Sequence, residues 1–306
     1  MDINKLKVFV DAAETLNFSE TAQRLHVTQP TISKYIRDLE NELSIRLFER
    51  SATGISLSEA GQSIMPWAQK LLSECRKFED LASSLDEEVT GRIRIACTTA
   101  AGKYILPQLG ARFRQLYPHV QISILSCTQE DALDRIMDED ADLCVVSSET
   151  RLERIETQNF FIDHIIMIAP ATHPFAKRKA IELSEILDEP VIIREPTSGT
   201  HRAVLAELAA HDITLDDLNI LLEVGNAEAI VAAVGAHLGL SFVSRMAAAY
   251  AIAFECVVEV PDNDIDLRRQ ICMARRTMAN PNRARDVFWG FVHDPVNDDL
   301  YRLANL

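Results

Sequence analysis

Apolar residues recur at the three- and four-residue spacing of amphipathic helices along the start of the chain. The apolar stripe of a first predicted helix consists of Leu6, Phe9, Val10, Ala13 and Leu16. A short second helix is predicted over Thr21–Leu25. A third begins after Thr28, a suitable N-cap, and has Pro30 in its first turn, where a missing N–H costs nothing. The segment therefore predicts a group of three helices.

The third predicted helix has two distinct faces. Its apolar face consists of Ile32, Ile36 and Leu39, and its polar face consists of Gln29, Thr31, Ser33, Lys34 and Arg37. A side-chain amide such as that of Gln29 can bond an adenine edge bidentately, and hydroxyls can reach bases or phosphates. Two short helices, a tight turn and this polar face favour a helix-turn-helix that reads DNA. An ordinary three-helix bundle with its polar face in water fits the same periodicity.

From Ser58 onward the apolar spacing alternates regularly between four and three residues. The positions of this seam are Ile64, Ala68, Leu71, Cys75, Phe78, Ala82 and Leu85. Such a heptad seam is typical of a helix that pairs with a second helix, so we predict a dimerisation helix. The alternative is a single amphipathic helix lying on its own domain, whose apolar stripe is usually wider. The acidic stretch Asp86–Gly91 is expected to be a hinge.

Beyond Gly91, short β-rich runs alternate with helical patterns. The predicted strands are Arg92–Cys97, Val120–Leu125, Leu143–Ser147, Ile165–Ala169, Val191–Ile193, Ile220–Val224 and Leu240–Val243. Helices are predicted over about 101–116 and 130–137. This alternation predicts an α/β domain with a parallel sheet, in which ligands bind beyond the carboxyl ends of the strands.

Small and polar residues follow several of these strands, where helices begin. The candidate ligand-binding residues are Thr98, Thr99, Ala100, Thr128, Ser198, Gly199, Thr200 and His201. The Ser198-Gly199-Thr200 turn offers backbone N–H groups, hydroxyl donors and a favourable helix dipole, which together suit an anion. Simple N-capping is the alternative for each loop taken alone, and convergence of several loops would favour a ligand site.

Composition changes this picture in two respects. The chain of 306 residues is long enough for two or three domains, and its formal net charge of −15 argues mildly against DNA binding. The segment Glu20–Arg50 is balanced, with five basic and five acidic residues. The chain contains no run of eighteen apolar residues and no secretory signal, and its six cysteines lack paired spacing. These features predict a reduced cytoplasmic protein without a membrane span.

Two other classes of function are weighed against a DNA-binding regulator. An enzyme is disfavoured because the sequence has no phosphate-loop, dinucleotide-binding, nucleophile-elbow or paired metal-ligand motif, and no cofactor or metal is expected. A thiol-based redox sensor is the second alternative, because Cys97 and Cys127 both lie near strand ends beside the expected cleft. Packing is the more common role of such cysteines.

The first sixty residues resemble the N-terminal signature of LysR-type transcriptional regulators. The resemblance rests on residues 18–33, 39–50 and 57–61, and it runs unbroken from about Leu6 to Gly61. It implies that the polar face of the third helix enters the major groove and that Arg50 belongs to a wing. Thr53 stands in this wing where arginine is frequent in the family. The expected DNA-contacting residues are Thr28, Gln29, Pro30, Thr31, Ser33, Lys34, Arg37, Arg50 and Thr53.

The remaining two-thirds are similar, more diffusely, to the regulatory domain of the same family, through residues 105–118, 173–174 and 235–240. That resemblance implies a two-lobed fold like that of periplasmic binding proteins. Lobe I is expected at about 91–162 and 267–306, and lobe II at about 163–266. The expected organisation is a winged helix-turn-helix over 1–58, a linker helix and hinge over 59–90, and an effector-binding domain over 91–306.

The resemblance also implies the partners. Promoter DNA and a small, anionic metabolite are expected, together with dimers through the linker helix and a further association into tetramers. The loop from Arg194 to Thr200 looks most like the branches of the family that regulate sulfur assimilation or carbon dioxide fixation. Those branches often have arginine at the position of His201.

Overall fold

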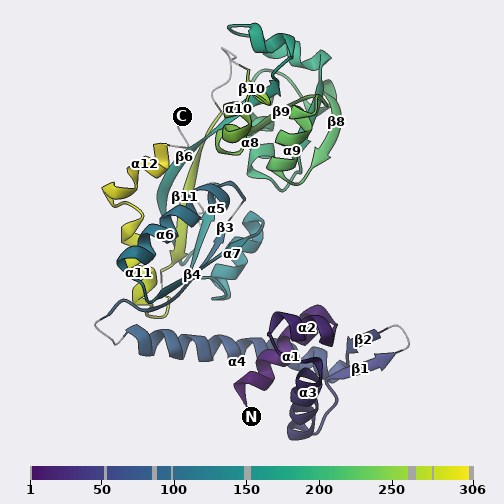
Figure 1. Cartoon of the computed structure of the whole chain (residues 1–306), viewed down its shortest axis with the longest axis vertical. Helices are drawn as coiled ribbons and strands as arrows, with labels where there is room; N and C mark the ends of the chain where they lie inside the picture. Colours follow the sequence, from purple (N-terminus) through teal and green to yellow (C-terminus); the bar gives the residue numbers. More distant parts are fainter. Residues whose placement is uncertain are drawn as a thin grey trace. The chain divides into compact units, whose positions relative to one another are not determined.

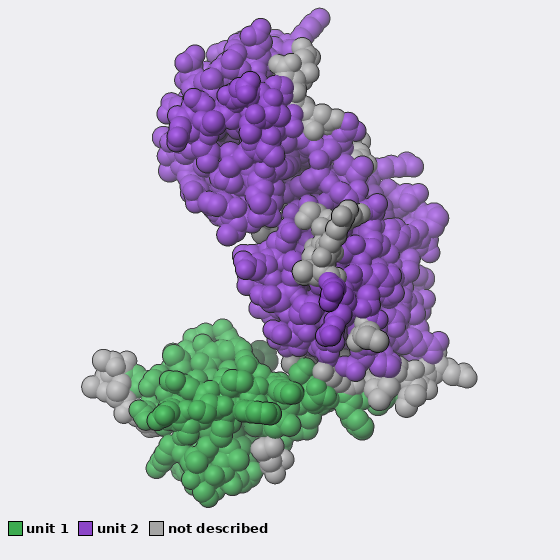
Figure 2. Space-filling model, turned by 180° about the vertical axis from the view of Figure 1, so that it is seen from behind, with its two compact units in different colours: residues 1–82 green, residues 83–306 purple. Residues whose placement is uncertain are grey.

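The computed structural model describes residues 2–51, 54–84, 88–97, 99–147, 153–260, 267–277 and 279–302 (Figure 1). The chain divides into two compact units, residues 1–82 and residues 83–306 (Figure 2). The first unit contains α1 (Ile3–Thr15), α2 (Phe18–Arg24), α3 (Gln29–Leu43), β1 (Phe48–Ser51), β2 (Gly54–Leu57) and most of α4 (Glu59–Ser84). All three predicted N-terminal helices are therefore present.

The core of the first unit forms where the apolar faces of these helices meet. Phe9, Ile32, Leu39 and Leu47 are fully buried in one cluster. Asn17 caps α2 by accepting hydrogen bonds from two backbone N–H groups. Thr28 occupies the N-cap position of α3, but its side chain makes no cap hydrogen bond and lies 2.8 Å from Thr31 Oγ1. The strands β1 and β2 pair antiparallel and form the hairpin of the wing.

The heptad seam on α4 is divided in its burial. Ala68 is only 1% exposed and belongs to the core of the first unit, against which Ile64 is also packed. Farther along, Leu71 is 43% exposed and Phe78 is 73% exposed. The first part of the seam therefore packs against its own domain, as expected for a single amphipathic helix. Only the exposed second part is available to pair with another helix. Leu85 lies outside the described residues.

The second unit contains a long, mixed sheet. Its strands run in the order β4-β3-β5-β11-β6-β9-β7-β8, and β10 pairs with β6, which makes nine strands within the described residues. The strands are β3 (Gly91–Cys97), β4 (Val120–Ser126), β5 (Leu143–Val146), β6 (Ile155–Pro170), β7 (Pro190–Arg194), β8 (Asn219–Val224), β9 (Leu240–Ser244), β10 (Val257–Glu259) and β11 (Arg268–Arg276). All seven predicted strands are confirmed, and β10 and β11 were not predicted.

Helices cover this sheet. They are α5 (Thr99–Tyr104), α6 (Leu106–Leu116), α7 (Gln129–Met137), α8 (Gly199–Ala210), α9 (Ala227–Gly235), α10 (Arg245–Ala253), α11 (Arg283–Phe291) and α12 (Asp298–Arg302). Short 3-10 helices span Pro174–Lys177, Leu183–Asp188, Leu215–Asp217 and Pro295–Asn297. The single helix predicted over about 101–116 is in fact two helices, which are separated at Ile105 just before Pro107.

The prediction of a parallel sheet is wrong at the two strands that join the lobes, β6 and β11. The strand β6 is much longer than the predicted 165–169, and β11 pairs antiparallel with both β5 and β6. Phe161 lies in the core of lobe I, whereas Ile165 lies in that of lobe II. On the return strand, Ile271 belongs to the core of lobe I. The two-lobed α/β fold is confirmed, with β6 and β11 as its crossing strands (Figure 1).

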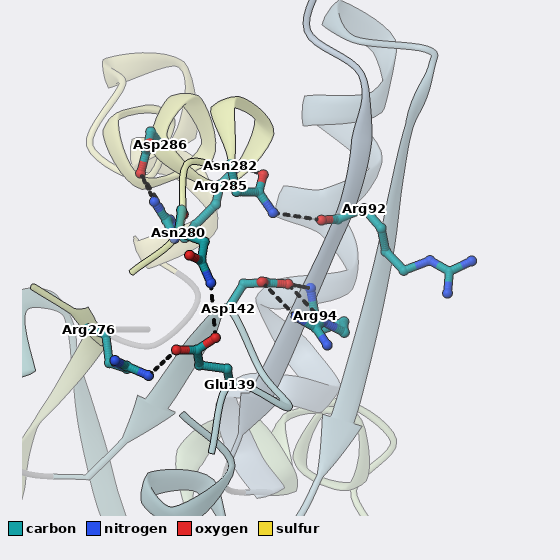
Figure 3. A network of polar contacts seen from close by, with 9 residues as sticks. All are labelled: Arg92, Arg94, Glu139, Asp142, Arg276, Asn280, Asn282, Arg285 and Asp286. Carbon is teal, nitrogen blue, oxygen red and sulfur yellow. Dashed lines mark hydrogen bonds and ion pairs between the residues drawn. The ribbon is translucent and has the colours of Figure 1, made fainter. Parts of the chain in front are cut away.

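A polar network fixes the returning segment onto lobe I (Figure 3). Arg94 on β3 binds Asp142 with both a 3.0 Å Nε–Oδ2 and a 2.9 Å Nη2–Oδ1 contact. Asn282 donates to the carbonyl of Arg92 at 3.1 Å, and Asn280 donates to Glu139 at 3.0 Å. Because these bonds join segments far apart in sequence, they hold lobe I as one body on which the ligand-facing loops are mounted.

Candidate DNA interface and ligand cleft

The polar face of α3 is open to solvent. Gln29, Lys34 and Arg37 are exposed, and Thr31 and Ser33 are half-buried. Gln29 Nε2 donates to Ser33 Oγ at 2.9 Å, one helical turn away. This bond orients the carboxamide and leaves its oxygen and its second N–H available, which is the donor–acceptor pair that recognises adenine.

The net charge of −15 argues against DNA binding, but the distribution of charge around α3 differs from that of the whole chain. Arg24 is surrounded by acids, with Asp11, Glu14 and Glu20 within 3.9 Å of its guanidinium. Lys34 and Arg37, in contrast, make no ion pair within the described part of the chain. The acids of this unit are therefore partly neutralised internally, while bases on the reading helix are left for phosphates. Thr28 and Pro30 are also exposed beside them.

Of the two predicted wing residues, the structure describes only the backbone of Arg50. Arg50 belongs to β1 by its backbone, and it pairs with Ile55 across the hairpin. Its side chain is outside what the structure describes, as is the whole of Thr53. Their predicted contacts with DNA stay predictions.

A cleft of about 420 Å³ lies in the second unit between the lobes. Its wall includes residues from the carboxyl ends of parallel strands, as the α/β rule predicts, among them Ser126 and Arg194. Lobe I contributes Thr128, Gln129 and Ser147, and lobe II contributes Ser198, Gly199, Thr200 and Ser244. Hydroxyl groups thus line both sides of the cleft.

The N-termini of α7, α8 and α9 all reach this cleft. Gln129, Gly199 and Ala227 are the first residues of these helices, and each lines the wall. Thr128 caps α7 through the N–H of Asp131 at 3.1 Å, and Ser198 caps α8 through the N–H of Thr200 at 3.2 Å. Thr128 and Ser198 thus do act as N-caps, which was the alternative to a ligand-binding role. The convergence of three positive helix N-termini on one cleft nevertheless favours binding of an anion.

A partly buried arginine lines the cleft beside α8. The guanidinium of Arg269, on β11, donates to Asp163 at 2.8 Å through Nε and to Thr200 Oγ1 at 3.1 Å through Nη1. Asp163 is fully buried and also accepts a 2.6 Å hydrogen bond from Ser244. A Cβ at Gly199 would lie 2.5 Å from Ser147 Oγ and 3.2 Å from Arg269 Nη1, so only glycine lets α8 approach this closely.

The structure brings together some of the predicted ligand-binding residues. Thr128, Ser198, Gly199 and Thr200 line the cleft. His201 does not, because its Nδ1 lies 2.6 Å from the carbonyl oxygen of Arg194 and its ring is buried between α8 and β7. Thr99 and Ala100 begin α5, but their side chains, and the whole of Thr98, are outside what the structure describes.

Sequence reasoning missed several residues that line the cleft. Ser147 is the last residue of a predicted strand, and Gln129 directly precedes the helix predicted over about 130–137, so position at the end of an element could have found them. Arg269 and Glu228 gave no such signal. Arg269 lies on a strand that was not predicted, and Glu228 is an ordinary acidic residue in the first turn of a helix.

The two candidate redox cysteines do not face one another. Cys97 lies in the core cluster of Ile93 and Ile95, whereas Cys127 packs against the cluster of Ala96. Because alternate residues of a strand point to opposite faces, these clusters lie on opposite faces of the sheet. Burial raises the pKa of Cys97 to about 12 and also raises the pKa of Cys127. Neither observation favours a thiol sensor, which needs an accessible thiolate.

The fold and these two sites define a regulator with a DNA-reading head and a ligand-binding domain. Residues 3–62 match the model of the bacterial regulatory helix-turn-helix proteins of the lysR family, and residues 86–296 match that of the LysR substrate binding domain. The chain belongs to the LysR family of DNA-binding transcriptional regulators. No helix within the described residues is long and apolar enough to cross a membrane.

Relatives and solved structures agree with this assignment. The uncharacterized HTH-type transcriptional regulator MJ0300 of Methanocaldococcus jannaschii is 30% identical over 95% of this chain and 98% of its own length. The activator CmpR of Synechocystis is 30% identical over 83% of this chain and 81% of its own. The LysR family regulator CbnR has a TM-score of 0.71 at 21% identity, covering 95% of this chain and 98% of that one. The regulatory domain of Synechocystis CcmR, in complex with 2-PG, has a TM-score of 0.61 at 27% identity, over 66% of this chain and 96% of that one.

Proposed function

We propose that this transcriptional regulator changes its binding to promoter DNA when a small anion occupies the cleft of the second unit. The observation that carries the proposal is the convergence of the α7, α8 and α9 N-termini with Arg269 on one cavity. The complex of CcmR with 2-PG supports it, because that regulatory domain shares this fold at 27% identity.

The lobes are connected in a way that lets a ligand act on their closure. Besides β6 and β11, they are bridged by Lys103 and Tyr104 of lobe I to Glu228, at 2.6 and 2.8 Å. A second bridge joins Arg202 of lobe II to Gln129 at 3.3 Å. A ligand shifts the balance between open and closed arrangements only by binding one of them better. Residues from both lobes line the cleft, so a bound anion favours closure.

Oligomerisation is the step that would transmit closure to DNA. The exposed part of the α4 seam, Leu71 and Phe78 with Cys75 and Ala82 beside them, is proposed to pair with the same helix of a second chain. The two helix-turn-helix domains of such a dimer would then bind a near-palindromic DNA site. Dimers are proposed to associate further into tetramers. Because its partner is promoter DNA, we place the protein in the cytoplasm.

Replacing Gln29 by alanine is expected to weaken operator binding by about 1–3 kcal/mol and to relax base preference at one position. The physical reason is the loss of the oriented carboxamide on the exposed face of α3. Electrophoretic mobility or fluorescence anisotropy with operator variants measures both effects. Asn41→Ala, which removes an exposed amide near the other end of the same helix, is the control and should bind normally. Equal effects of the two changes would refute the assignment of the reading face.

Replacing Gly199 by alanine is expected to lower anion affinity at least tenfold and to leave operator affinity of the free protein intact. The added Cβ would push α8 away from Ser147 and Arg269 and so open the anion cradle. A thermal-shift titration with sulfate, phosphate, 2-PG and small carboxylates measures affinity, because ligand binding raises stability. Gly110→Ala in α6 is the control, since its Cβ meets Ile122 at an ordinary 3.5 Å. An unchanged response in Gly199→Ala would contradict the cleft assignment.

A further inference from the structure

The charges on the cleft wall are balanced. Among the described residues, the arginines that line it are Arg135, Arg194 and Arg269, and the carboxylates are Asp131, Glu195 and Glu228. Directly behind this wall, Asp163 adds one negative charge and Lys103 one positive charge, so the balance is kept. A cavity built for a multiply charged anion would carry an excess of positive charge. This one is better matched to a ligand with little net charge.

The two helices that would contact the ends of a ligand, α8 and α9, lie on opposite faces of the lobe II sheet. Val204 of α8 packs in a cluster with Met167, whereas Ile230 of α9 packs in a cluster with Ile168. Adjacent residues of β6 point to opposite faces, so α8 and α9 lie on opposite sides of the sheet. The anion cradle at the start of α8 and the carboxylate of Glu228 on α9 therefore face a bound ligand from different sides.

Glu228 keeps the capacity to accept a hydrogen bond from a ligand. Lys103 Nζ lies 2.6 Å from Oε2, and Tyr104 Oη donates to Oε1 at 2.8 Å. The carboxylate also accepts a hydrogen bond from its own backbone N–H. Its two oxygens together can accept four hydrogen bonds, so acceptor capacity remains, and the side chain is 40% exposed. Burial raises the pKa of Glu228, but the bonds from Lys103 and Tyr104 outweigh burial and lower it. The group is thus an ionised acceptor at neutral pH.

We propose that the effector is a small molecule with one anionic group and, at its other end, an ammonium or hydroxyl donor that Glu228 selects. The anionic group lies at the start of α8 with Thr200 and Arg269, and the donor lies on Glu228. A second acidic group in place of the donor would meet the Glu228 carboxylate and be repelled. The inference rests on the proposed function, because it assigns the chemistry of the ligand in the same cleft.

Matched ligands test this selection on the full-length protein. One triplet is 4-aminobutyrate, 4-hydroxybutyrate and succinate, and a second is phosphoethanolamine, 2-hydroxyethyl phosphate and phosphoglycolate. Within each triplet the anionic end is the same and the far end is an ammonium, a hydroxyl or a second acid. Thermal-shift titration should give about tenfold to hundredfold tighter binding of the ammonium member than of the diacid, since a hydrogen bond to a charged group has that effect.

Glu228→Gln should reduce this preference at least tenfold, because it removes the charge and keeps the shape. The ratio within a triplet is insensitive to any change in lobe closure, since every member needs the same closure. Glu223→Gln, an equal change on the exposed strand β8 outside the cleft wall, should keep the wild-type preference.

Three outcomes overturn the inference: a diacid that binds the wild type as tightly as its ammonium partner, a preference that Glu228→Gln leaves unchanged, or no binding by any donor-bearing member. Suppose that no donor-bearing member binds, but sulfate or phosphate stabilises the protein and alters operator binding. The proposed function then stands without this inference. If no anion stabilises the protein or alters operator binding, the proposed function and this inference both fail.

Discussion

Replacing Gly61 by alanine is expected to destabilise the DNA-reading unit by about 3 kcal/mol and to abolish operator binding at ordinary temperatures. Gly61 lies in the first turn of α4, and a Cβ there would lie 2.1 Å from the carbonyl oxygen of Leu47 and 3.0 Å from Leu57 Cδ2. The carbonyl cannot retreat easily, because Leu47 is fully buried and accepts a hydrogen bond from the N–H of Ser58 at 3.0 Å. The helix must therefore move off the core that it completes through Ala68.

Chemical denaturation followed by circular dichroism measures this loss, and anisotropy with labelled operator measures binding. Gly290→Ala in α11 is the control, because no described atom lies within 4 Å of its added Cβ. That variant should gain about 0.5–1 kcal/mol, the usual benefit of alanine over glycine inside a helix. A Gly61→Ala protein as stable as the wild type would mean that α4 does not pack on the reading unit as described.

The first unit could be predicted closely because its signals are local. The spacing of Phe9, Ile32 and Leu39 alone indicates which faces are buried, and these residues are buried in the structure. The same reasoning could not divide the α4 seam between its own core and a partner. Ile64 and Phe78 lie fourteen residues apart and occupy equivalent heptad positions, but only Ile64 packs against the core of its own unit.

The cleft could be predicted in part, through strand ends and helix starts. Its remaining residues depend on pairing between distant segments, which periodicity does not reveal. Arg269 reaches Thr200 only because β11 returns beside β6, and the two residues are far apart in sequence. His201 was predicted to face the ligand because it follows the Ser-Gly-Thr turn, but the helix has already turned its ring back toward the carbonyl of Arg194.

The second large effect is expected at Asp163, the buried carboxylate beneath the cleft. Asp163→Ala should destabilise the second unit by about 3–5 kcal/mol, because it leaves the guanidinium of Arg269, which is 12% exposed, without its counterion. The variant should also lose anion binding, since Asp163 holds Arg269 where it meets Thr200. Thermal unfolding monitored with and without sulfate or phosphate measures both effects.

The same two strands supply a matched control. Glu156 pairs with Arg275 at 2.8 Å across β6 and β11, as Asp163 pairs with Arg269, but Glu156 is 45% exposed. Glu156→Ala should therefore cost about 0–1 kcal/mol, because solvent screens the pair.

A double variant separates stability from binding. Replacing Asp163 by leucine and Arg269 by methionine removes both charges of this largely buried pair, and such replacements are often neutral or stabilising. We expect most of the stability to return while the anion response stays absent, because the cradle has lost its guanidinium. If the double variant bound anions as well as the wild type, Arg269 would have no part in the ligand site. If Asp163→Ala were no more costly than Glu156→Ala, burial of the pair would not be what stabilises the crossing between the lobes.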